Sequence, residues 1–127
     1  MNPQEVPKKL ILLAEDDKDM RVIYSSMLVK GGYEVEIAPD GDCALDMIRN
    51  RNWDLLLLDI MLPKIDGISI LKLITQDKLK KGKIVVLTVL NNENIIEDAF
   101  KYGADGFIIK SEITPGGLLD EMKAYLQ

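Results

Sequence analysis

The chain contains no histidine, and it has one cysteine and one tryptophan. Without histidine it cannot build a Ser-His-Asp triad, a Cys-His pair, an imidazole zinc site or a phosphohistidine of its own. The single cysteine, Cys43, cannot form an intramolecular disulfide, and the N-terminus carries no secretory signal sequence. We therefore expect a reducing, cytoplasmic compartment. No apolar run approaches the roughly 20 residues that cross a bilayer, so we expect no membrane insertion.

Positive charge is in the minority, with 16 Lys and Arg against 21 Asp and Glu and a net charge of −5. This balance disfavours direct binding of nucleic acid. Lysines cluster at positions 78, 80, 81 and 83, and we interpret this short run as a solvated loop. The 127 residues fit one domain that buries roughly two-thirds of its unfolded surface. We assign residues 1–8 to an N-terminal tail and residues 9–127 to the domain.

Apolar residues come in short blocks at 10–14, 55–58, 84–87 and 107–109. Such blocks are typical of strands that are buried on both faces, as in a parallel sheet. Residues 33–37 instead alternate between apolar and acidic side chains, which indicates a strand at an edge of the sheet. The sequence therefore predicts five strands.

Segments with helical spacing separate these strands. The first ends at Gly31, the second follows the N-cap Asp40, and the last begins at Thr114. A third segment covers residues 68–74, and a fourth begins near residues 91–92 and ends at Gly103. The predicted buried positions of the first and fourth helices are Met20, Ile23, Tyr24, Met27 and Leu28, and Ile95, Ile96, Ala99 and Phe100.

Strand and helix thus alternate five times, which predicts an α/β fold with right-handed crossovers and helices on both faces of a parallel sheet. The expected architecture is a doubly wound, flavodoxin-like (βα)5 fold with strand order 2-1-3-4-5. In such a fold the ligand crevice lies at the carboxyl ends of strands 1 and 3. Functional residues should therefore follow the apolar blocks directly.

Acidic residues occur at these positions. Glu15, Asp16 and Asp17 follow the first strand, although Asp17 also suits the cap of the first helix. Asp59 ends the third strand, where an unpaired carboxylate costs several kcal/mol in lost solvation. Two carboxylates about 4 Å apart repel by roughly 4 kcal/mol at an effective dielectric of 20. A hard divalent cation with oxygen ligands, Mg²⁺, would relieve this repulsion between Asp16 and Asp59.

A hydroxyl and an ammonium follow the last two strands, at Thr88 and Lys110. Each is uninformative alone, because threonine favours strands and lysine at a strand end is usually solvated. Together with the carboxylates they predict a phosphoryl-transfer site: a carboxylate nucleophile, a metal, a hydroxyl donor and a cation that contacts the phosphoryl oxygens.

This arrangement resembles the receiver domain of two-component response regulators, and the resemblance covers residues 9–127. It rests on these residues in chain order: Glu15, Asp16, Asp59, Met61, Pro63, Asp66, Gly67, Thr88, Phe107 and Lys110. Each of these residue types is common, but their order at the ends of successive strands is specific to the family.

The resemblance implies that Asp59 is the phosphoacceptor. Asp16, Asp59 and the backbone carbonyl of Met61 would bind Mg²⁺, and Glu15 would act through a coordinated water. Thr88 and Lys110 would contact the phosphoryl oxygens.

It also implies that Thr88 and Phe107 form the switch, Phe107 changing rotamer on activation. A histidine kinase, a histidine phosphotransfer protein or a small phosphodonor would supply the phosphoryl group. A downstream protein target would bind the surface formed by helix 4, strand 5 and helix 5. The domain would be a monomer or a phosphorylation-dependent dimer.

Three positions depart from the family pattern. Val89 follows the switch threonine where smaller residues are usual, Ser111 replaces the proline that often follows the lysine, and Phe107 lacks the hydroxyl of the commoner tyrosine. Met61 and Leu90 lie two residues beyond Asp59 and Thr88, and their apolar side chains predict slow hydrolysis of the phosphoryl group.

Two alternatives to phosphorylation-dependent signalling remain open. A receiver-like adaptor would bind partners without phosphorylation, which Val89 and Ser111 favour. A Mg²⁺-dependent phosphohydrolase of the haloacid-dehalogenase type needs a second aspartate two residues after its nucleophile. Met61 occupies that position, so the hydrolase is the weaker alternative.

Overall fold

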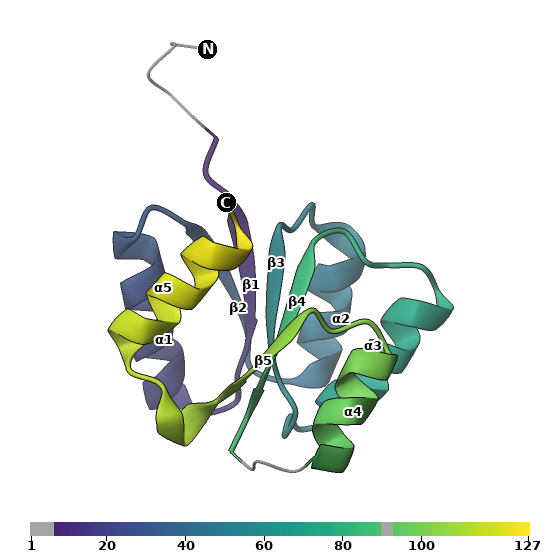
Figure 1. Ribbon diagram of the computed structural model, residues 1–127. Helices are drawn as coiled ribbons and strands as arrows, with labels where there is room; N and C mark the ends of the chain where they lie inside the picture. The colour runs from purple at the N-terminus through teal and green to yellow at the C-terminus, as the bar shows by residue number, and fades with distance from the viewer. Residues whose placement is uncertain (1–6, 90–92) are drawn as a thin grey trace.

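The structure is a computed structural model that describes residues 7–89 and 93–127. Five parallel strands form one sheet in the order β2-β1-β3-β4-β5, which confirms the predicted fold class and strand order (Figure 1). The elements in chain order are β1 (Leu10–Ala14), α1 (Lys18–Lys30), β2 (Glu34–Ala38), α2 (Gly41–Asn50), β3 (Leu55–Asp59), α3 (Gly67–Gln76), β4 (Lys83–Thr88), α4 (Glu93–Lys101), β5 (Gly106–Ile109), the 3-10 helix η1 (Lys110–Glu112) and α5 (Pro115–Tyr125).

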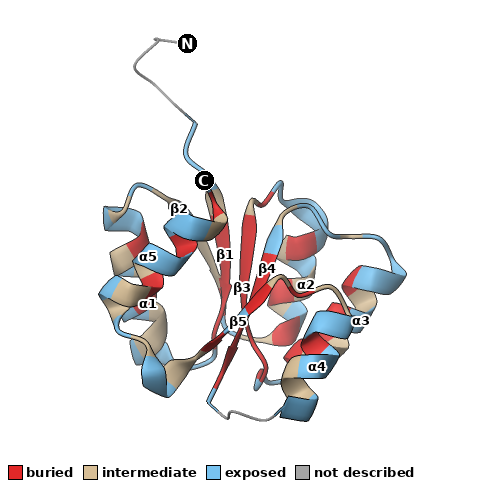
Figure 2. Ribbon diagram, in the orientation of Figure 1, coloured by how far each residue is buried: buried red, intermediate tan, exposed pale blue. Residues whose placement is uncertain are grey.

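Helices cover both faces of the sheet: α1 and α5 lie on one face, and α2, α3 and α4 on the other (Figure 1). The leucines of β3 alternate between two apolar cores. Leu55 and Leu57 pack with the α1 and α5 side chains, whereas Leu56 and Leu58 pack with α2, α3 and α4. All four are fully buried, and the central strands form the buried centre of the molecule (Figure 2). This burial on both faces explains the continuous apolar block.

Four helices begin at a side chain that accepts a backbone N–H of the first turn. Asp17 caps α1, Asp40 caps α2, Asp66 caps α3 and Thr114 caps α5. These caps satisfy donors that the helix itself leaves unpaired. The start predicted for the fourth helix, near residues 91–92, lies outside the described residues.

Two predicted core positions are wrong. Phe100 of α4 is 44% exposed and Ile23 of α1 is 42% exposed. In α4 only Ala99 is fully buried, because this helix lies beside the edge strand β5 and has little sheet to cover. The Phe100 ring instead contacts Phe107 edge-to-face, with the ring centroids 6.1 Å apart.

Aspartates also cap the amino-terminal edge of the sheet, which the sequence did not reveal. Asp54 Oδ2 accepts the backbone N–H of Leu10 at 2.8 Å, and Asp105 Oδ2 accepts that of Ile84 at 2.8 Å. The lysine-rich loop before β4 contributes as well, since Lys80 donates to the Gly103 carbonyl and pairs with Asp105 at 3.0 Å. The interpretation of this loop as solvated therefore missed a structural role.

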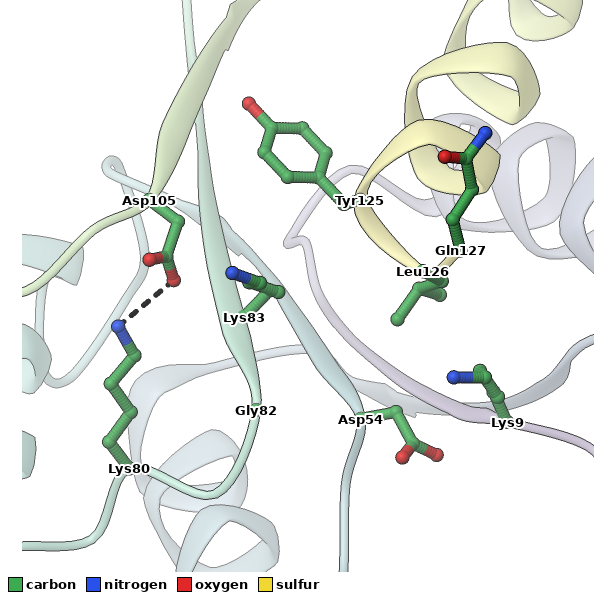
Figure 3. A pocket seen from close by; sticks show the side chains of 9 residues that line it. All are labelled: Lys9, Asp54, Lys80, Gly82, Lys83, Asp105, Tyr125, Leu126 and Gln127. Carbon is green, nitrogen blue, oxygen red and sulfur yellow. Dashed lines mark ion pairs between the residues drawn. The ribbon is translucent and has the colours of Figure 1, made fainter.

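A polar cavity of about 340 Å³ lies at this amino-terminal edge, between the strand ends and the last turn of α5. Figure 3 shows its lining side chains, including the ion pair between Lys80 and Asp105. Asp54 and Asp105, the two aspartates that line the cavity, already accept backbone N–H groups of the strands. Their role is therefore to stabilise the sheet. None of the helices formed by residues 7–89 and 93–127 has the length and hydrophobicity of a membrane-spanning segment.

Candidate functional site

Three carboxylates meet at the carboxyl edge of the sheet, as predicted. β1 and β3 pair directly, with Ala14 opposite Leu58, so the residues that follow come together. Glu15, Asp16 and Asp59 each offer an oxygen within 4.8 Å of the others. Glu15 and Asp59 are buried, whereas Asp16 is exposed. Two buried carboxylates at this spacing repel each other, and a nearby cation or the uptake of a proton relieves that repulsion.

The Lys110 ammonium supplies that cation. Its Nζ lies 2.6 Å from Asp59 Oδ2 and 2.6 Å from Glu15 Oε2, although Lys110 follows β5 at the far edge of the sheet. Burial alone would lower the pKa of Lys110, but the hydrogen bonds to Asp59 and Glu15 raise it overall. The ammonium therefore stays charged at neutral pH and bridges two strands that are not its neighbours.

The burial and crowding of these charged groups change the pKa of Glu15. Burial raises the pKa of Glu15 to about 7; Lys110 opposes this rise, and the neighbouring Asp59 adds to it. In the metal-free protein, Glu15 therefore exchanges its proton near neutral pH. A divalent cation would favour the ionised carboxylate and so oppose the rise in the pKa of Glu15.

The Asp59 carboxylate is oriented through both of its oxygens. Oδ2 contacts Lys110, and Oδ1 accepts the backbone N–H of Met61 at 2.9 Å. The Met61 side chain points outward and is 66% exposed. Asp59 is thus presented in a fixed direction at the end of a rigid strand.

These residues line an open cleft of about 410 Å³. Its lining residues are Glu15, Asp16, Asp17, Met20, Asp59, Met61, Val89 and Lys110. The donor set of several carboxylate oxygens, with no cysteine or histidine among the lining residues, suits a hard cation such as Mg²⁺. The candidate metal residues named from the sequence therefore lie together, and their chemistry fits that ion.

Thr88 and Phe107 are not among the cleft-lining residues. Thr88 ends β4, where it is buried beside Ile109, the residue before Lys110. Phe107 lies on β5 with 39% of its surface exposed and its ring against Phe100. Val89 is 53% exposed on the rim, and Leu90 lies outside the described residues. The 3-10 helix η1 begins at Lys110 itself, and no peptide bond in the described chain is cis.

A sequence profile described as "Response regulator receiver domain" matches residues 11–123. The chain belongs to this family. Receiver domains of response regulators are signalling domains that work by phosphorylation, and they typically use Mg²⁺. The acidic group of this receiver domain, formed by Glu15, Asp16 and Asp59, is consistent with that use.

Relatives of this receiver domain include transcriptional regulators and a chemotaxis protein. It is 37% identical to the transcriptional regulatory protein DltR of Streptococcus agalactiae over 100 residues, which cover 79% of this chain and 44% of DltR. It is 34% identical to the chemotaxis protein CheY of Bacillus subtilis over 101 residues, covering 79% of this chain and 83% of CheY. The chain spans less than half the length of DltR.

Solved structures show the same fold. A CheY-like receiver domain protein from Methanospirillum hungatei JF-1 matches with a TM-score of 0.86 and 31% identity, covering 94% of each chain. The Francisella response regulator 1452 receiver domain matches with a TM-score of 0.85 and 28% identity, covering 94% of this chain and 97% of that one.

The stability of the metal-free protein should fall as the pH rises from about 5 to 8. The folded state holds the Glu15 proton more tightly than the unfolded state, because its pKa is raised from 4.5 to about 7. The unfolding free energy should therefore decrease across this window, by at most about 3 kcal/mol. Urea unfolding in EDTA at several pH values measures the slope.

The matched variant for this experiment is Glu15→Gln, which removes the titrating group and should flatten the slope. Saturating Mg²⁺ should flatten it in the wild type. A wild-type stability that is constant or rises from pH 5 to 8 in EDTA would contradict the assignment.

Proposed function

We propose that this chain is a phosphoacceptor receiver domain, in which Asp59 accepts a phosphoryl group from a phosphohistidine of a partner protein. The observation that carries the proposal is the Asp59 carboxylate itself, buried at the end of β3 and held between Lys110 and two further carboxylates. The 127 residues contain no histidine, so the donor phosphohistidine lies outside this domain.

The chemistry follows from the placement of these groups. A carboxylate oxygen of Asp59 attacks phosphorus in line with the leaving imidazole nitrogen of the donor. The P–N bond breaks, its electron pair stays on that nitrogen, and an acyl phosphate forms on Asp59. Lys110 stabilises the charge on the phosphoryl oxygens. Mg²⁺, when bound by Asp16, Asp59 and the Met61 carbonyl, with Glu15 acting through a water, would neutralise phosphoryl charge.

The acyl phosphate then offers new acceptors to the Thr88 hydroxyl. Thr88 moves towards them, and Phe107 leaves its place beside Phe100 to fill the space behind it. The pairing of the two rings in the described conformation supports an outward starting position of Phe107. A difference of a few kcal/mol between the two arrangements suffices for such a switch. The surface of α4, β5 and α5 would then change for a downstream target.

The partners follow from this cycle. The donor is a histidine kinase or a histidine phosphotransfer protein, and the receiver is a monomer or a phosphorylation-dependent dimer. We place the reaction in the cytoplasm, with no direct contact to nucleic acid through this domain.

Incubation with acetyl phosphate and Mg²⁺ tests the proposal. We expect a single phosphoryl adduct in the intact mass spectrum, absent when EDTA replaces Mg²⁺. Failure with several phosphodonors would contradict the proposal. It would favour the phosphorylation-independent adaptor, for which Val89 on the rim of the cleft is the supporting observation.

The phosphoryl group should hydrolyse slowly because Met61 restricts the approach of water. Met61 is highly exposed and lines the cleft beside Asp59. Met61→Asn should therefore speed the decay of purified phosphoprotein severalfold, measured as loss of the adduct with time. Val29→Asn, an exposed apolar position on α1 away from the cleft, is the matched control. Equal decay rates in Met61→Asn and the wild type would exclude shielding.

A further inference from the structure

The loop between β1 and α1 is held by an arginine that the family resemblance did not single out. Arg21 lies in the first part of α1, and its guanidinium reaches back over the loop. Nη1 donates to the backbone carbonyl of Asp16 at 2.7 Å and lies 3.3 Å from the carbonyl of Glu15. One side chain thus ties the backbone of two residues in the acidic group.

The contact matters because Asp16 has no other support. Glu15 and Asp59 are fixed by Lys110, and Asp59 also accepts the Met61 N–H. In the part of the chain that the structure describes, no hydrogen bond or ion pair holds the Asp16 carboxylate, which is exposed. The direction of that carboxylate therefore depends on the backbone to which Arg21 donates.

The remaining contacts of the loop hold its two ends. At the start, the Glu15 N–H donates to the Ala38 carbonyl at 3.1 Å. At the end, Asp17 caps α1 by accepting the Met20 N–H at 3.0 Å, and its own N–H lies 3.3 Å from Glu15 Oε1. None of these three contacts involves the Asp16 carbonyl, so Arg21 orients the middle of the loop.

We propose that Arg21 is a positioning residue for a divalent cation bound at Glu15, Asp16 and Asp59. The proposal rests on the metal site of the proposed function and adds a residue to its support. Simple electrostatics predicts the opposite effect, because the positive guanidinium of Arg21 next to the site repels a cation and should weaken its binding. Removal of the charge alone would tighten metal binding, whereas loss of the orientation of Asp16 weakens it.

Mg²⁺ titrations of the metal-free protein by isothermal calorimetry separate these two effects. Arg21→Met removes both the charge and the hydrogen bonds, and it should raise the Kd for Mg²⁺ by about 10-fold, the usual cost of losing a partner that orients a metal ligand. Arg21→Lys keeps the charge and one donor, so its loss should be smaller. Arg51→Met, which breaks the surface pair with Glu36, should leave the Kd unchanged.

The effect should also depend on Asp16. In an Asp16→Asn background, Arg21→Met should change Mg²⁺ affinity much less, because the ligand that it orients has been weakened already. Urea unfolding in EDTA shows that each variant is folded before titration.

A Kd in Arg21→Met that equals or falls below the wild-type value would overturn the positioning role, because it would leave only charge repulsion. An equal loss in the Asp16→Asn background would overturn it as well. Wild-type protein that binds no Mg²⁺ would instead contradict the metal site of the proposed function, so the two failures are distinguishable.

Discussion

Asparagine in place of Asp59 should eliminate the phosphoryl adduct formed with acetyl phosphate and Mg²⁺. The amide has no carboxylate oxygen to attack phosphorus, so the loss should reach the background of the intact mass measurement. The fold should persist, because asparagine has nearly the same size and its oxygen can still accept the Met61 N–H. The variant also removes one of two buried carboxylates that raise each other's energy.

The matched control is Asp42→Asn, an exposed position in the first turn of α2. It makes the same chemical change away from the cleft and should phosphorylate at the wild-type rate. An adduct of undiminished yield in Asp59→Asn would place the phosphoacceptor elsewhere and overturn the assignment. Peptide mapping of that adduct would then identify the modified residue.

Replacement of Lys110 by methionine should cost both reactivity and stability. The ammonium is the cation that contacts Asp59, so its loss should slow phosphorylation by about 10²- to 10³-fold, as for a lost transition-state donor. It also leaves two buried carboxylates unpaired, which should lower the unfolding free energy in EDTA by about 3–5 kcal/mol at pH 8. The loss should be smaller at pH 6, where a carboxylate takes up a proton.

The phosphorylation rate is measured from reactions that are quenched at successive times, and the free energy of unfolding is measured separately by urea unfolding. Lys123→Met on the exposed side of α5 is the control and should change neither. Wild-type phosphorylation rates in Lys110→Met would show that the ammonium does not act on the phosphoryl group. Unchanged stability at pH 8 would show that Glu15 and Asp59 do not need it.

The sheet and its order were predictable because the physical signal was strong. The leucines of β3 are buried on both faces of the sheet. A continuous apolar block of this kind fits few structures other than a strand that is covered on both sides. The buried side chains of the fourth helix were harder to predict. The spacing of apolar residues indicates a helix, but it does not indicate how much of the sheet that helix covers. Phe100 was therefore expected in the core, although α4 covers an edge strand and leaves that ring beside Phe107.

The site was predictable where side chains follow strands directly. The meeting of Glu15, Asp16 and Asp59 follows from adjacent parallel strands. Arg21 was missed because it binds backbone carbonyls, which leave no pattern in the side-chain sequence. Asp54 and Asp105 were missed for the same reason, since they accept backbone N–H groups of neighbouring strands.

The contact of Lys110 with two carboxylates makes this ammonium a resident counter-ion. When all three carboxylates are ionised, they and the one ammonium leave a surplus of two negative charges, which one divalent cation would balance. An acyl phosphate on Asp59 would add negative charge and so tighten the hold on that cation. By thermodynamic reciprocity the cation would then favour the phosphorylated form to the same degree. The equilibrium between the unphosphorylated and the phosphorylated form would therefore depend on the free Mg²⁺ concentration.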